Sequence, residues 1–294
     1  MLTRPVVVTA AVALASGCCT VPAGRFKALA DSTLQLKQVE TQAYNQSVEI
    51  EHAWIVVTQK PGDLTLHSFD LESAFDSTGS EHPVKDLGAR LEANGAALTV
   101  IANYLTALSS FANKDFQSDL DKNATKLAVS VQSLKDLSQP WATDAAQSSG
   151  ILATVIDSLG HAYIDYERLE ALRRAMDSAQ TPLSQLTQFV ITNDDVVNVA
   201  LTTIEGDYLQ DANLLRPRVV GAQRLMFDSY VAQVIGQFND EQKTLTGLNK
   251  TMVSLPKAHQ ELADTMCSSN PDLDNLETLI SETERLSNFY KSVK

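Results

Sequence analysis

Residues that interrupt regular structure are scarce in this chain of 294 residues, since glycine occurs 12 times and proline 9 times. Long segments therefore run without a helix breaker. Stretches in which apolar and polar residues alternate strictly are also missing, as are Asn-Gly or Asp-Gly turns between such stretches. These absences argue against a β-sheet and favour an all-α fold.

The apolar residues that are present recur with the spacing of a helix. Leu91, Leu98 and Leu105 are seven residues apart, and similar stripes run through residues 36–57, 152–169 and 183–208. The last stripe keeps one register across the polar sequence TNDDVV, so this segment is expected to be helical, with Asp194 and Asp195 facing solvent. The pattern predicts a bundle of about six to eight long antiparallel helices.

Prolines and capping residues predict where these helices end. Thr181-Pro182 and Asn270-Pro271 each place an N-cap residue before a proline at the first helical position, and Pro140 precedes another start. Pro217 and Pro256 are expected to break or kink a helix. The expected helices cover residues 25–58, 84–112, 114–138, 141–178, 182–214, 218–254, 256–267 and 271–292.

Basic side chains are outnumbered, with 23 lysines and arginines against 36 aspartates and glutamates, a formal net charge of −13. An acidic surface of this kind repels nucleic acid and anionic lipid headgroups. Nucleic acid is therefore not an expected partner, and any attachment to a membrane has to come from something other than a basic patch.

Cysteine occurs only three times, and two of the three, Cys18 and Cys19, are adjacent near the N-terminus. Arg4 precedes a short apolar run, Val6–Leu14, which is followed by the small residues 15–17. This is the layout of a secretory signal peptide. The 13 residues between Arg4 and Cys18 are fewer than the roughly 20 of a membrane-spanning helix.

Ala15-Ser16-Gly17-Cys18 resembles the lipobox of bacterial lipoproteins. The resemblance implies cleavage before Cys18 and attachment of fatty acyl chains, such as palmitate, to this residue. Because the next residue is Cys19 and not aspartate, it also implies sorting to the outer membrane, on its periplasmic face. The alternative is an ordinary secretory leader with incidental cysteines. Removing residues 1–17 takes away Arg4 and no acid, which leaves 22 basic and 36 acidic side chains and a net charge of −14.

The expected organisation is a removed leader (1–17), a short tether (18–24) and one helical-bundle domain (25–294) with a long loop at 59–84. The six residues between Cys18 and Arg25 reach about 20 Å when extended, so the body would lie close to the bilayer. A disulfide between Cys19 and Cys267 is possible in an oxidising compartment. The loop is expected to be a solvated acidic excursion. The alternative is an interaction loop, with the candidate residues His67, Asp70, Glu72, Glu81 and His82.

Few residues carry a pattern typical of chemistry. Glu49 and His52 have the Glu-x-x-His spacing that di-iron bundles use, but the second such pair is missing and both lie away from the apolar stripe, so they are weak metal candidates. His161 and Asp165 are expected to form a surface pair. The G-x-S-x-G, P-loop, G-x-G-x-x-G and paired C-x-x-C motifs are absent. No catalytic residue and no cofactor is predicted.

Three functions remain open at this stage. The first is a non-enzymatic binding or scaffold module of the cell envelope, lipid-anchored to the outer membrane and partnered by another envelope protein. The second is an immunity or inhibitor-type lipoprotein that binds a basic protein, which the negative charge would suit. The third is a metal- or ligand-dependent enzyme whose site is assembled from distant helices.

Overall fold

The computed structural model describes residues 22–58, 87–113, 117–137, 139–159, 165–266, 268 and 271–293. The side chains of Tyr44 and of residues 47–58, 87, 165–167 and 293 are outside this description. The described residues form seven α-helices and two short 3-10 helices, and no strand occurs among them. The prediction of an all-α bundle with about six to eight helices is confirmed.

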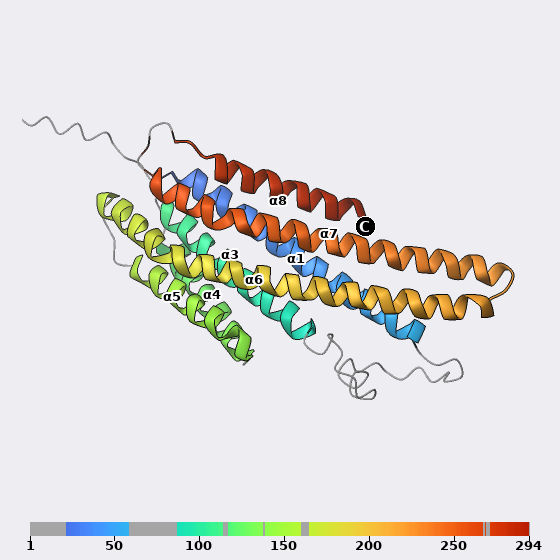
Figure 1. Cartoon of the computed structure of the whole chain (residues 1–294). Helices are drawn as coiled ribbons and strands as arrows, with labels where there is room; N and C mark the ends of the chain where they lie inside the picture. The colour runs from blue at the N-terminus through green and yellow to red at the C-terminus, as the bar shows by residue number, and fades with distance from the viewer. Residues whose placement is uncertain are drawn as a thin grey trace, which may run out of the picture.

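The helices follow one another along the chain (Figure 1). Their bounds are α1 Ala23–Thr58, α3 Leu87–Ala112, α4 Gln117–Asp136, η1 Pro140–Ala142, α5 Thr143–Leu159, α6 Asp165–Leu215, η2 Arg216–Arg218, α7 Ala222–Asp264 and α8 Asp274–Val293. At 1.5 Å per residue, the 51 residues of α6 span about 77 Å and the 43 residues of α7 about 65 Å.

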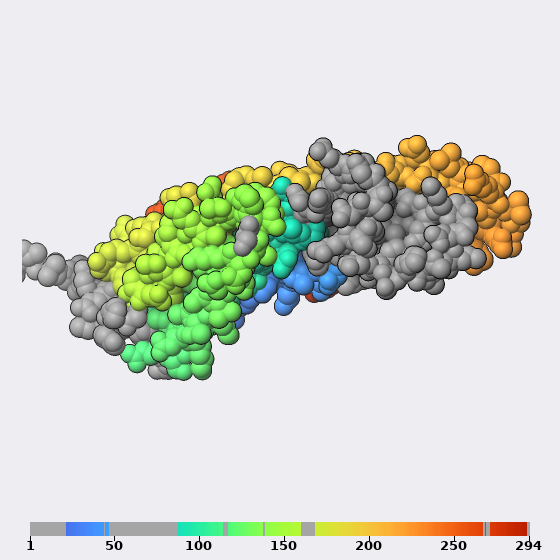
Figure 2. Space-filling model, turned by 90° about the horizontal axis from the view of Figure 1, so that it is seen from below, coloured from blue at the N-terminus to red at the C-terminus, as the bar shows by residue number. Residues whose placement is uncertain are grey.

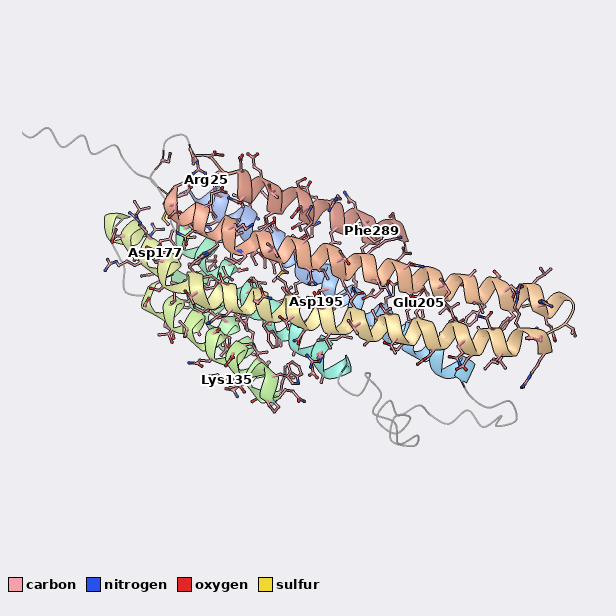
Figure 3. All side chains as sticks on the ribbon, in the orientation of Figure 1. Arg25, Lys135, Asp177, Asp195, Glu205 and Phe289 are labelled. Carbon is pink, nitrogen blue, oxygen red and sulfur yellow. The ribbon has the colours of Figure 1, made fainter. Side chains whose placement is uncertain are left out.

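Two helices, α3 and α6, connect the two sides of the bundle. α3 packs against α1, α4, α5 and α6, whereas α7 packs against α1, α6 and α8. The molecule is elongated, and the hairpin of α6 and α7 forms one of its ends (Figures 1 and 2). Asn249 and Gln242 of α7 donate hydrogen bonds to Asp195 and Glu205 of α6, at 2.9 and 3.3 Å, along the exposed side of this hairpin (Figure 3).

The apolar stripes read from the sequence form the core. Every described member of the stripes at 91–112 and 183–208 is buried, and one continuous hydrophobic cluster takes residues from all seven α-helices. Phe111 is buried among them. The α3 segment Gly88–Ala112 is long and apolar enough to cross a membrane by length and composition alone. However, 67% of its most apolar window is buried inside the bundle, as in the central helix of any packed core.

The predicted breaks at Pro182 and Pro256 are wrong, because Pro182 lies inside α6 and Pro256 inside α7. A proline inside a helix costs about 3 kcal/mol, since it removes one hydrogen bond and its ring meets the preceding turn. The buried apolar residues before and after each proline lie on the same face of the helix. The free energy gained by burying them exceeds this local cost. Pro217, in contrast, interrupts the chain as predicted, because η2 and residues 219–221 separate α6 from α7.

The predicted continuous helix at 141–178 is also wrong. α5 ends at Leu159 and α6 begins at Asp165. The two helices pack side by side, and the Ser148 hydroxyl donates a hydrogen bond of 2.7 Å to the side-chain oxygen of Gln185. A single straight helix would separate these two residues by about 55 Å. The start predicted after Pro140 is confirmed, since η1 begins there and leads directly into α5.

The last helix begins at Asp274 and not at Pro271, because a side chain of another helix supplies its cap. The carboxylate of Glu261 in α7 accepts hydrogen bonds from the backbone N–H groups of Asn275 and Leu276, at 3.1 and 2.9 Å. It also accepts one from the Asn275 amide at 2.8 Å. The first N–H groups of a helix have no partner within the helix, and the positive end of the helix dipole favours a carboxylate there. Asn270 lies outside the described residues.

We therefore expect Glu261→Ala to lower the free energy of unfolding by about 1–2 kcal/mol, because it removes the cap of α8. Urea unfolding followed by circular dichroism measures this change. The matched control is Glu284→Ala, at an exposed position of α8, which makes the same chemical change without touching a helix end. Equal effects of the two substitutions would contradict the capping role.

Candidate binding site

The site residues named from the sequence lie beyond what the structure describes. Residues 59–86, all three cysteines and His161 are outside the described part of the chain. Asp165 begins α6, but its side chain is not described, so its predicted pairing with His161 stays a prediction. Glu49 and His52 belong to α1, but their side chains are not described. The following candidates therefore stay predictions: Cys18, Glu49, His52, His67, Asp70, Glu72, Glu81 and His82.

A groove of about 750 Å³ lies between η1, α5 and α6, with Arg90 of α3 at its edge. We call it the Trp141 groove. Pro140 starts η1 and so directs Trp141 onto α6, where its ring stacks on Phe189 with the ring centroids 6.0 Å apart. Most of the remaining lining residues carry amide or hydroxyl groups; they include Gln147, Ser148, Ser178, Thr181, Gln185, Gln188, Thr192 and Asn193.

Pro182 contributes to this surface in two ways. It lines the groove itself, and without an N–H group it leaves the backbone carbonyl of Ser178, four residues earlier, without its helical donor. Ser178 also lines the groove. The proline that α6 tolerates thus removes one helical hydrogen bond at a residue that lines the groove.

Arg90 is the positively charged group of the groove. Its guanidinium carbon lies 4.7 Å from the centre of the Trp141 ring, which is cation–π geometry. One of its nitrogens, Nη1, donates a hydrogen bond of 2.8 Å to the Asn193 side-chain oxygen. Within the described residues, no carboxylate lies at ion-pair distance from Arg90. The groove therefore offers a cation that an anionic or strongly polar ligand group can approach.

A chain of buried amides leads from Arg90 into the core. Asn193 Nδ2 donates to Asn94 Oδ1 at 3.0 Å, and Asn94 Nδ2 donates to Asp194 Oδ1 at 2.6 Å. All three side chains are buried, with Asn94 on α3 and the other two on α6. The groove is thus connected through hydrogen bonds to a carboxyl group inside the bundle.

The expectation that Asp194 faces solvent is wrong, because its side chain is fully buried. Asp195 is exposed, as predicted. A helix with a single neighbour buries one stripe, but α6 is in contact with α1, α3, α5 and α7. Its buried face is therefore wider than the stripe that its apolar residues form, and this face includes positions 193 and 194.

Glu40 of α1 is the second buried acid of this region, with only 3% of its surface exposed. Neither of its carboxyl oxygens has a hydrogen-bond partner, and neither does Asp194 Oδ2. Burial raises the pKa of the Glu40 carboxyl well above its usual range, and the charge of Asp194 raises it further. Burial also raises the pKa of Asp194, although the hydrogen bond from Asn94 partly offsets this. Both groups therefore keep their protons to a higher pH than an exposed carboxyl group does.

A second polar network lies between α3, α6 and α7. The Gln180 amide nitrogen donates to the Pro256 carbonyl at 3.0 Å, so its oxygen faces His259 Nδ1 at 2.7 Å. His259 must then carry its proton on Nδ1, and its Nε2 accepts from the Tyr104 hydroxyl at 3.0 Å. Burial lowers the pKa of His259 to about 3, so the ring is neutral.

This second network has the composition of a catalytic group but not its access. His259 and Tyr104 are fully buried, and Gln180 separates them from a shallow pocket of about 630 Å³ on the surface of α7. All donors and acceptors of the imidazole are used. We conclude that the network holds α3, α6 and α7 together.

Among the described residues, no group of three or more histidine, cysteine, aspartate or glutamate side chains could hold a metal ion. The arrangement at the Trp141 groove is suited to binding, because it combines an aromatic face, a cation and many hydrogen-bonding groups without a nucleophile beside a base.

Comparisons with models of protein families, with curated proteins and with solved structures found no match.

The buried acids predict a specific dependence of stability on pH. Because the pKa of Glu40 is raised in the folded state, the unfolded chain ionises first as the pH rises above about 4.3, and stability is lost from there upward. Glu40→Gln removes this loss. We expect it to raise the free energy of unfolding by roughly 1–3 kcal/mol at pH 8 and to change it little at pH 4.

Denaturant unfolding at several pH values measures this difference between the variant and the parent. The contribution of His259 is the same in both proteins and cancels. Glu92→Gln, at an exposed position of α3, is the control and should show no such trend. A Glu40→Gln effect that is independent of pH would show that the carboxyl is ionised in the folded protein.

Proposed function

We propose that this protein is a lipoprotein of the bacterial outer membrane that faces the periplasm and acts as a non-enzymatic binding or scaffold module. Acyl chains on Cys18 are its attachment to the membrane, and another envelope component is its partner. The observation that carries the proposal is the sequence Ala15-Ser16-Gly17-Cys18, which follows a short apolar run. Two or more acyl chains anchor a protein stably.

Two features of the helical body support this function. α1 begins at Ala23, five residues after Cys18, so a lipid on Cys18 would hold the bundle close to the bilayer. The Trp141 groove supplies a surface with an aromatic face and a cation that has no described acidic partner, and such surfaces are typical of binding sites. We infer that a polar or anionic segment of the partner binds in this groove.

The anchor is tested by mass and by fractionation. The intact mass of the native protein should correspond to a chain that begins at Cys18 and carries acyl chains. Cys18→Ser should give a folded protein that a high-salt wash removes from the membrane fraction, because its covalent lipid attachment is lost. An unmodified residue 18, a retained leader, or a variant that resists the high-salt wash like the parent would refute the anchor.

The groove is tested by photo-crosslinking in cells. A photoreactive amino acid at Gln147, an exposed position that lines the groove, should form a discrete adduct with the partner. Arg90→Glu should remove most of this adduct, because it replaces the cation of the groove with an acid in addition to Asp144, which also lines the groove. The same amino acid at Glu284, an exposed position of α8, should give no such adduct. Equal yields at both positions would exclude the groove as the binding surface.

A further inference from the structure

The end of the hairpin formed by α6 and α7 differs from the rest of the molecule. We call residues 213–233 the hairpin tip; they comprise the last residues of α6, η2, the turn at 219–221 and the start of α7. No residue of the hairpin tip is buried. The bundle core ends at Ala212 on α6 and begins again at Val234 on α7, so the tip projects beyond it (Figures 1 and 2).

The hairpin tip exposes large apolar side chains. Leu214, Val220, Leu225 and Met226 each have between 62% and 75% of their surface exposed, and Tyr230 has 40%. Leu225, Met226 and Val220 are the three most exposed large hydrophobic residues in the described part of the chain. Leu214 precedes the turn at 219–221, Val220 lies in it, and Leu225 and Met226 follow it, so these side chains do not lie along one helix face. Water-soluble surfaces rarely gather such residues without a binding partner.

The charge of the hairpin tip is opposite to that of the whole chain. The tip contains Arg216, Arg218 and Arg224 but only one acid, Asp228. Arg216 and Asp228 form a two-pronged ion pair, with distances of 2.9 and 3.0 Å, that joins η2 to α7. Arg218 and Arg224 remain as net positive charge in a protein with a formal charge of −13. This local charge favours an anionic surface as the partner, contrary to the expectation from the net charge that no basic patch attaches the protein to a membrane.

The shape of the hairpin tip favours a lipid surface over a protein. Two helix ends side by side cover about 20 by 10 Å, whereas one face of an ordinary protein–protein interface buries about 800 Å². A projecting end that combines exposed apolar side chains with arginines fits the boundary of a bilayer. There, apolar side chains enter the acyl region and arginines contact headgroup phosphates.

We propose that the hairpin tip inserts into the surface of a bilayer that contains anionic phospholipids. Leu225, Met226 and Val220 enter the lipid, and Arg218 and Arg224 bind the phosphates. This membrane contact is separate from the acyl anchor on Cys18, because the start of α1 near Arg25 and the hairpin tip lie at opposite ends of the molecule (Figure 3). The inference holds whether or not Cys18 is acylated.

The test uses the full chain with Cys18→Ser, so that no acyl chain contributes, and measures co-sedimentation with vesicles. We expect binding to vesicles of phosphatidylcholine mixed with phosphatidylglycerol, weaker binding to phosphatidylcholine alone, and a decrease with salt. Arg218→Glu with Arg224→Glu should weaken binding by tenfold or more, since each basic residue near an anionic surface contributes roughly fivefold. Leu225→Ser with Met226→Ser should also weaken it about tenfold.

The matched control is Lys126→Glu with Val129→Ser, at exposed positions of α4, which should bind like the parent.

A second readout is specific for position: the tryptophan emission of Leu225→Trp should shift to the blue on anionic vesicles, and that of Val129→Trp should not. Parent-like binding of both tip variants, or equal shifts at positions 225 and 129, would overturn the proposal. A dimer that forms through the tip in place of vesicle binding would overturn it too and identify a second copy as the partner. None of these results bears on the mass of residue 18, so the anchor is judged separately.

Discussion

The rest of the structure depends on the packing of α6 against four other helices at once, namely α1, α3, α5 and α7. Its neighbours bury apolar residues along most of its length, from Leu172 to Ala212. This extended burial explains why Pro182 does not end the helix, because the local cost of one proline is small beside it. It also explains why two polar residues, Asn193 and Asp194, are drawn into the interior.

The two buried polar networks differ in how well their groups are satisfied. The buried rings of His259 and Tyr104 are hydrogen-bonded to each other and, through His259, to Gln180, so the imidazole uses both of its nitrogens. Glu40 and Asp194 keep buried oxygens without partners, and such groups cost stability. Natural proteins tend to keep such costs where a function requires them. Of these two acids, Asp194 is hydrogen-bonded through Asn94 and Asn193 to Arg90, which lies at the Trp141 groove.

The surface is divided along the length of the bundle. The body is acidic, whereas the hairpin tip, at the far end from the start of α1, is basic and apolar. A lipid on Cys18 and a hairpin tip in lipid would hold an elongated bundle at two points about the length of α7 apart, or about 65 Å. The Trp141 groove lies between these points, on the side of α5 and α6. A protein held in this way presents its groove at a defined distance from the bilayer and in a defined orientation to it.

The sequence by itself determined the helical class, the apolar stripes and the break at Pro217, because these follow from local spacing and from the backbone chemistry of single residues. The proposed leader and the lipobox resemblance likewise rest on a short segment of the sequence. Only the tertiary structure decided that α6 and α7 continue through their prolines, that Asp194 is buried, that Glu261 caps α8, and that residues 90, 141, 189 and 193 meet at one groove. The reason is physical: spacing along a helix shows which side is most apolar, whereas the number of neighbouring helices decides how much of its circumference is covered.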